Sequence, residues 1–119
     1  MNYTLYQSQQ KGNKMDIKSE IENIINNNEI CLFMKGVPEA PQCGFSMTVS
    51  NILKHLGANF KGVNVLDNEE IRNGVKTFSD WPTIPQLYVK GEFVGGCDIV
   101  KEMYEKGELK ELLKSKSLI

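Results

Sequence analysis

Apolar residues recur along this chain at two spacings, which predict helices and strands in alternation. Ile17, Ile21 and Ile25 fall on one face of a helix, and the asparagine-rich run "NIINNNE" ends that helix. The unbroken apolar run "EICLFMK", residues 29–35, has the length of a strand buried on both faces, and Gly36 ends it. The chain therefore begins its fold with a helix and the central strand of a covered sheet.

The middle of the chain repeats this order. After "GVPEAPQ", which we interpret as a loop, an apolar stripe predicts a second helix with Cys43 at its N-terminus and Gly57 as its C-cap. "GVNVL" predicts a short strand, and "DNEE" predicts that Asp67, with Glu70 three residues later, caps a third helix. That helix is expected to bury an apolar face formed by Ile71, Val75 and Phe78.

The last part of the chain predicts a hairpin and a broken helical segment. "PQLYVKGEFVGG" predicts two strands joined at Lys90-Gly91, and helical packing from Asp98 onward is interrupted at Gly107. This order predicts a small α/β sandwich with a parallel β-α-β unit and an added antiparallel hairpin. Residues 1–15 are expected to be a disordered tail, and residues 16–119 to be the domain.

Composition narrows the classes of partner and compartment. The 119 residues suit one domain, and 14 basic against 15 acidic side chains form no basic stripe for nucleic acid. Nucleic acid is therefore not an expected partner. No apolar segment is long enough for a membrane span or a signal peptide, so a membrane is not an expected partner either. Three cysteines are too few for a disulfide framework, which favours a reducing intracellular compartment, mitochondrial or cytoplasmic.

The candidate chemistry lies in "PQCGFS", residues 41–46. A helix N-terminus and a nearby cation, here Lys35, can lower a thiol pKa from about 8.5 to between roughly 3.5 and 7.5. Cys43 could instead be a small buried hydrophobe, but its place in a loop at a helix start favours function. Ser46 stands where a dithiol enzyme has its second cysteine, which disfavours dithiol reduction, and we expect its hydroxyl to bond backbone amides.

Three motifs occur in order along the chain: "KGVPEAPQCGFS", "WPTIPQLYV" and "GEFVGGCD". Together they resemble the monothiol glutaredoxin family of the CGFS type, in the single-domain form similar to the mitochondrial iron-sulfur glutaredoxins, over residues 17–113. The resemblance implies a thioredoxin-like fold, with a four-stranded mixed sheet flanked by helices. It also implies glutathione binding and a [2Fe-2S] cluster that bridges a homodimer. Two copies of Cys43 and two glutathione thiols would supply the four thiolates that such clusters commonly have.

The resemblance also assigns site residues. It implies that Cys43 is both the catalytic residue and the cluster ligand, and that the Ile84–Pro85 bond is cis. Without the family, Arg72 and Lys76 would be read as the polar face of a helix. The residues expected to contact glutathione are Lys35, Cys43, Phe45, Arg72, Lys76, Thr83, Ile84, Pro85, Gly96, Cys97 and Asp98.

Function stays open between two classes. The first is a carrier in iron-sulfur cluster transfer, assembly and iron homeostasis, with a BolA-like protein and apo iron-sulfur proteins as partners. The second is a glutathione-dependent oxidoreductase that removes glutathione from proteins by a one-cysteine route, which the insertion "VPEAP" makes weak at most. A third hypothesis, a Cys43–Cys97 disulfide sensor, needs Cα atoms within about 7 Å. Cys31 is expected in the core, His55 on the surface and Trp81 packed in its loop.

Overall fold

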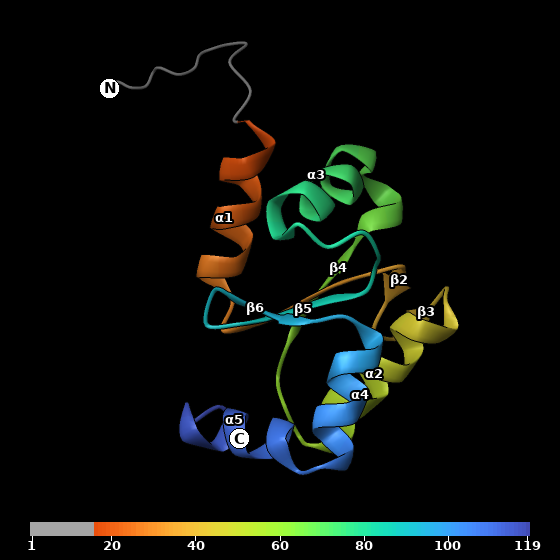
Figure 1. The fold of residues 1–119 in the computed structure, drawn as a ribbon. Helices are drawn as coiled ribbons and strands as arrows, with labels where there is room; N and C mark the ends of the chain where they lie inside the picture. The colour runs from red at the N-terminus through yellow and green to blue at the C-terminus, as the bar shows by residue number, and fades with distance from the viewer. Residues whose placement is uncertain (1–15) are drawn as a thin grey trace.

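The computed structural model describes residues 16–119, so the expected tail at residues 1–15 lies outside the described part. Helices and strands alternate as the apolar pattern predicts, with one extra hairpin near residue 36 (Figure 1). The elements in chain order are α1 Ile17–Asn27, β1 Ile30–Met34, β2 Gly36–Val37, β3 Ala40–Pro41, α2 Gly44–His55, β4 Lys61–Asn64, the 3₁₀ turn η1 Val65–Asp67, α3 Glu69–Ser79, β5 Gln86–Val89, β6 Glu92–Gly95, α4 Cys97–Glu105 and α5 Glu108–Ser115.

The main sheet has four strands in the order β4-β1-β5-β6. β1 pairs with β4 in parallel and with β5 in antiparallel, and β5 pairs with β6 in antiparallel. Figure 1 shows α1 and α3 on one face of this sheet and α2, α4 and α5 on the other. The predicted mixed four-stranded sheet between helices is thereby confirmed.

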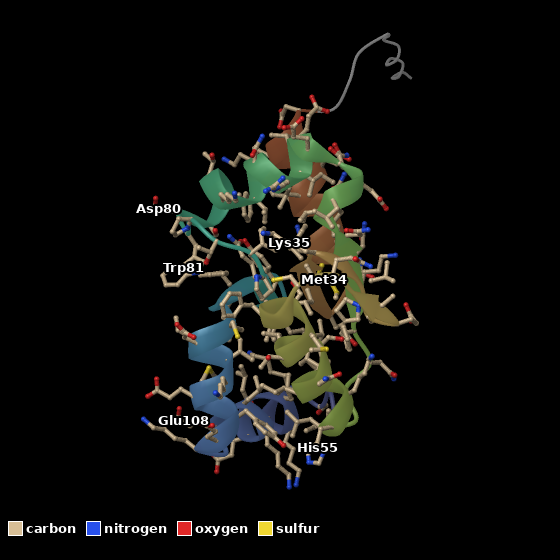
Figure 2. All side chains as sticks on the ribbon, turned by 90° about the vertical axis from the view of Figure 1, so that its right-hand side faces the viewer. Met34, Lys35, His55, Asp80, Trp81 and Glu108 are labelled. Carbon is tan, nitrogen blue, oxygen red and sulfur yellow. The ribbon has the colours of Figure 1, made fainter. Side chains whose placement is uncertain are left out.

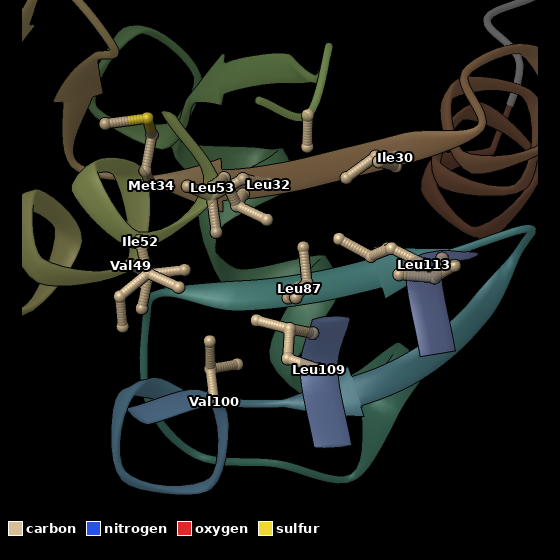
Figure 3. Packing of buried hydrophobic residues seen from close by; sticks show 12 residues of the cluster. Ile30, Leu32, Met34, Val49, Ile52, Leu53, Leu87, Val100, Leu109 and Leu113 are labelled. Carbon is tan, nitrogen blue, oxygen red and sulfur yellow. The ribbon is translucent and has the colours of Figure 1, made fainter. Parts of the chain in front are cut away.

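Each face of the sheet has its own apolar core, because side chains alternate along β1. Leu32 points into the core formed with α2, α4 and α5, where Leu87 of β5 and Val100 of α4 meet it (Figure 3). Cys31 and Phe33 point the other way, into the core formed with α1 and α3. Cys31 is a core residue as predicted, and burial raises its pKa to about 12.

The segment predicted as a loop, "GVPEAPQ", forms the small β2–β3 hairpin. Gly36 has a φ of 93°, and a Cβ there would lie 2.6 Å from the Gln42 amide nitrogen, so the turn requires glycine. Lys54 of α2 donates a hydrogen bond from its Nζ to the Pro38 carbonyl. The Pro38 ring covers Gly62 of β4, where a Cβ would lie 2.6 Å from the ring. The hairpin is thus fixed by distant residues of α2 and β4, which local sequence does not reveal.

The third helix begins one residue later than predicted. Its N-cap is Asn68, whose Oδ1 accepts from the Ile71 amide at 3.1 Å, while Asp67 closes the 3₁₀ turn. Asn64 initiates that turn, because its Oδ1 accepts from the Leu66 amide at 3.0 Å and ends β4. Phe78 is half-buried rather than buried.

The C-terminal elements follow the sequence pattern. Lys90 and Gly91, with φ of 52° and 81°, form the predicted turn between β5 and β6. Gly107, with φ of 77°, separates α4 from α5 as predicted. In the described part of the chain, none of the helices is long and apolar enough to span a membrane.

Candidate functional site

Cys43 is the N-cap of α2, with an extended backbone (φ −148°), and its side chain stands over the first turn of the helix. It makes no ordinary cap hydrogen bond, since sulfur is a weaker and larger acceptor than oxygen. The thiolate is nevertheless favoured, because the Ser46 amide lowers the pKa of Cys43 by more than burial raises it, and the Phe45 amide and the Lys35 charge lower it further. Cys43 is therefore a half-buried thiol activated by a helix start.

Ser46 links Cys43 to the neighbouring strand end. Its side chain is fully buried, and its Oγ accepts a hydrogen bond from the Lys35 amide at 3.0 Å. The hydroxyl of Ser46 also contributes to the lowered pKa of Cys43. The predicted structural role of Ser46 is confirmed. A serine here holds Lys35 beside the thiol and supplies no second thiol.

Cys43 at the start of α2 and Lys35 after β1 form the first wall of the site. The second wall is the loop of residues 81–85 between α3 and β5. The Ile84–Pro85 peptide bond is cis, as the resemblance implied. The Trp81 ring packs against Phe93 of β6, with ring centroids 5.9 Å apart. Its Nε1 is buried and has no hydrogen-bond partner among residues 16–119. The prediction that Trp81 packs in its loop is confirmed, but its place in the wall of the site was missed.

The third wall is the start of α4. Gly96 is the N-cap, and a Cβ there would lie 2.9 Å from Trp81 Nε1 and 3.3 Å from the Pro85 carbonyl oxygen. Only glycine lets this backbone approach the loop so closely. Cys97 follows as the first helical residue. Burial, and then the charge of Asp98, raise the pKa of Cys97, and the neighbouring Cys43 adds to this effect.

These three walls enclose a cavity of about 520 Å³, within the usual range for small-molecule sites. Lys35 and Trp81, both labelled in Figure 2, line it from separate elements. Phe45 stands at the rim with 63% of its surface exposed. Ten predicted residues line it together: Lys35, Cys43, Phe45, Lys76, Thr83, Ile84, Pro85, Gly96, Cys97 and Asp98.

Two lining residues were not predicted as site residues, and one predicted residue is not in the lining. Trp81 and Pro82 line the cavity, and their place just before "TIP" is the sequence signal that could have included them. Arg72 lies on α3 outside this lining, one helical turn before Lys76. Its contact with glutathione stays a prediction.

The site joins a nucleophilic sulfur to groups that attract anions. Lys35 and Lys76 bring two positive charges, and the lining also contains the N-terminus of α4, where helices favour negative charge. Asp98 adds one carboxylate, which suits an ammonium group. Within residues 16–119, no three His, Cys, Asp or Glu side chains are grouped so that they could hold a metal ion. One chain thus offers a single activated thiolate, and any metal cluster needs further ligands from outside it.

Comparison with known proteins shows the family of this chain. The glutaredoxin family model matches residues 30–94. A probable monothiol glutaredoxin 2 of Rickettsia conorii is 57% identical over 95 residues, which are 80% of this chain and 89% of that protein. The chloroplastic monothiol glutaredoxin-S14 of Arabidopsis thaliana is 52% identical over 95 residues, 80% of this chain and 55% of that protein.

The solved structures show the same relationship in three dimensions. The solution structure of reduced apo GrxS14 from poplar has a TM-score of 0.75 at 48% identity, and the match covers 85% of this chain and 96% of that one. A monomeric truncated mutant of 1-C-Grx1 from Trypanosoma brucei has a TM-score of 0.79 at 42% identity, covering 90% of this chain and 96% of that one. With one activated cysteine before Gly44-Phe45-Ser46, the chain belongs to the glutaredoxin family as a monothiol glutaredoxin.

Proposed function

We propose that this protein carries a [2Fe-2S] cluster, held between two copies by Cys43 and bound glutathione, and passes it to apo iron-sulfur proteins. The observation that carries the proposal is the single activated thiolate of Cys43 at the edge of an anion-attracting cavity. Such a thiolate is an iron ligand, because only the deprotonated sulfur binds metal.

The ligand count supports a shared cluster. Four thiolates commonly hold a [2Fe-2S] cluster. Of the three cysteines, Cys31 is buried with its pKa raised to about 12, and the pKa of Cys97 is also raised, so neither is a good ligand. Cys43 contributes one thiolate per copy, and two glutathione molecules would contribute the other two. A cluster held partly by small molecules can be released readily, as a carrier requires.

The surface around Cys43 supports a second copy above it. Phe45 and Met47 in the first turns of α2 expose 63% and 48% of their surface, and Val37 of the hairpin exposes 38%. Of these three side chains, Phe45 also lines the cavity, and exposed large apolar side chains beside a site are typical of a protein contact. They would exclude water from a cluster between two copies.

The cavity suits glutathione, a tripeptide with two carboxylates, one ammonium group and a thiol. The charges of Lys35 and Lys76 and the α4 amides would bind its carboxylates, and Asp98 its ammonium group. The backbone of Ile84 at the cis bond would pair with the extended peptide. This arrangement would place the glutathione sulfur beside Cys43.

Anaerobic reconstitution tests the proposal. The wild type, Cys43→Ser and Cys97→Ser are each incubated with iron, sulfide and glutathione, and absorbance and molecular mass are measured. We expect a coloured dimer with the wild type and Cys97→Ser, and a colourless monomer with Cys43→Ser. Omitting glutathione should also prevent cluster formation. A cluster of equal yield on Cys43→Ser would refute Cys43 as the ligand.

Transfer and partners are tested separately. We expect the loaded dimer to convert an apo [2Fe-2S] protein to its holo form, and to form a mixed complex with a BolA-like protein. A reducing intracellular compartment, mitochondrial or cytoplasmic, is part of this proposal, because glutathione must be abundant and reduced there.

The alternative function is a glutathione-dependent oxidoreductase, and a third assay tests it by measuring turnover of a protein–glutathione disulfide. The Cys43 thiolate would attack a protein–glutathione disulfide and release the protein thiolate. A second glutathione thiolate would then attack the glutathione sulfur of the Cys43 mixed disulfide, which forms oxidised glutathione and releases the Cys43 thiolate. We expect at most weak turnover, because the insertion "VPEAP" before Cys43 would hinder the approach of the second glutathione. Rapid turnover by a protein that forms no cluster would favour the oxidoreductase.

A further inference from the structure

We infer that Gln86, which lies behind the 81–85 loop, is a positioning residue that holds this loop in the shape that binds glutathione. The inference rests on the proposed function of the cavity and deepens it. Gln86 is the first residue of β5, follows the cis Pro85 and is fully buried. It is not among the residues that line the cavity, so it acts on a ligand only through the loop.

The amide of Gln86 bonds the loop at two points. Its Nε2 donates to the Trp81 carbonyl and to the Thr83 carbonyl, each at 3.1 Å. Both N–H bonds of the amide are thereby used, and its Oε1 accepts from the Tyr88 hydroxyl at 3.2 Å. A buried amide with its donors satisfied at fixed positions is a rigid support.

The loop needs such a support because its own backbone can make few bonds. Its five residues, 81–85, all line the cavity. Pro82 and Pro85 have no N–H to donate, so part of the loop cannot be held by ordinary backbone pairing. The two carbonyls that Gln86 holds lie on either side of Pro82. The side chain of Gln86 therefore donates the hydrogen bonds to these carbonyls that backbone amides donate in regular helices and sheets.

Aromatic contacts and hydrogen bonds connect Gln86 to Trp81 by a second route. The Trp81 ring packs on Phe93, and the Phe93 ring packs on Tyr88 with centroids 5.4 Å apart. The hydroxyl of Tyr88 then bonds Gln86, which bonds the Trp81 backbone. Tyr88 lies in the middle of β5 and is 1% exposed. Residues of β5 and β6 thus hold the 81–85 loop in two ways. Phe93 packs against the Trp81 side chain, and Gln86 bonds the Trp81 backbone.

This support is independent of the activation of Cys43. The pKa of Cys43 is lowered by the Ser46 and Phe45 amides and by Lys35, which come from α2 and the end of β1. A change at Gln86 should therefore weaken glutathione binding and leave the acidity of Cys43 as it was. A general loss of structure would alter both properties together.

The test measures glutathione affinity by calorimetry and the pH profile of Cys43 alkylation in the same variants. Gln86→Met keeps the length of the side chain and removes both donors. We expect about tenfold weaker glutathione binding, as the loss of two hydrogen bonds permits, with an unchanged Cys43 profile. Tyr88→Phe removes only the bond to Oε1 and should weaken binding about two- to threefold. If Gln86→Met does not fold, Tyr88→Phe decides the question.

Leu87→Ala is the matched control. Leu87 is the next residue of β5 and is equally buried, but its side chain points into the core on the other side of the sheet. It should lower stability and leave glutathione affinity unchanged below the unfolding temperature. Equal affinity in wild type and Gln86→Met, or equal weakening in Leu87→Ala, overturns the inference alone. A wild type that binds no glutathione overturns the proposed function, and the inference with it.

Discussion

Two helices of this protein begin at the same cavity with a cysteine, and the two thiols differ in acidity. Cys43 begins α2 and Cys97 begins α4, and both are half-buried. The pKa of Cys43 is lowered, chiefly by the Ser46 amide, whereas the pKa of Cys97 is raised, chiefly by burial. A helix N-terminus is therefore not enough to activate a thiol.

The difference follows from one position in the helix register. Cys43 is the N-cap, so its side chain stands over the free amides of the second and third helical residues, Phe45 and Ser46. Cys97 is the first residue inside α4, and the N-cap there is Gly96, which has no side chain. Asp98 next to Cys97 adds a negative charge where Cys43 has Lys35 nearby. The site thus combines an acidic thiol at Cys43 with a less acidic one at Cys97.

The largest expected effect is a difference in alkylation between the two thiols. A lowered pKa means that the thiolate forms at lower pH, so the midpoint for Cys43 should fall below that of an ordinary cysteine thiol and that for Cys97 above it. Iodoacetamide labelling from pH 5 to 11, with mass spectrometry of each peptide, measures both. Cys31, with its pKa raised to about 12, should react only after unfolding. Coincident profiles for Cys43 and Cys97 would end the comparison.

The two helix starts should also differ in their tolerance of a methyl group. Gly96→Ala should lower the free energy of unfolding by about 1–3 kcal/mol, because its Cβ would lie 2.9 Å from Trp81 Nε1. Gly44→Ala at the start of α2 is the matched control, since nothing lies within 4 Å of the added Cβ. It should change stability by less than about 0.5 kcal/mol. Urea denaturation measures both, and equal losses would contradict the crowding at Gly96.

Removing the Ser46 hydroxyl should affect the start of α2 and leave the start of α4 unchanged. Ser46→Ala leaves the Lys35 amide without its acceptor, which costs about 1–2 kcal/mol of stability. It should raise the pKa of Cys43 only in part, because the backbone amide of residue 46, which has the largest effect, remains. Thr48→Ala is a control, since the Thr48 hydroxyl bonds the Gly44 carbonyl. An alkylation midpoint for Cys43 that shifts equally in both variants would assign the effect to the helix as a whole.

The smallest expected effect is that of the Lys35 charge. Lys35→Gln should raise the pKa of Cys43 slightly, since Lys35 contributes less than the two amides. The rise should shrink in 1 M salt, where the screening length is only about 3 Å. Lys76→Gln should weaken glutathione binding and leave the Cys43 midpoint unchanged, because Lys76 lines the cavity but does not affect that pKa. A salt-independent rise in Lys35→Gln would indicate a structural change.

The elements that could be predicted are those whose pattern is local. The isoleucine repeat of α1, the apolar run of β1 and the Lys90–Gly91 turn depend on neighbours in sequence. The β2–β3 hairpin could not be predicted, because Lys54 and Gly62 hold it from other elements. Asp67 and Asn68 are both able to cap a helix, and the 3₁₀ turn that selects Asn68 forms through Asn64.

The residues of the candidate site likewise divide into those that the sequence predicted and those that it did not. Of the ten predicted lining residues, nine lie in the three motifs, and Lys76 was predicted from the family resemblance alone. Trp81 was predicted only to pack, and Gln86 was not singled out. Gln86 is polar and lies at the start of an apolar strand, a pattern that equally suits a strand end in solvent. Its value depends on two carbonyls that a bend of the chain brings to it.

By itself, the sequence determined the order of helices and strands, the single thiol at residue 43 and the absence of a second thiol three residues later. These depend on the spacing of apolar residues and on residue identity, which are local properties. Only the tertiary structure decided that the pKa of Cys97 is raised although it also lies at a helix start, and which glycine cannot change. The physical reason is that pKa and packing depend on the amides, charges and atoms that other segments of the chain bring within a few ångströms.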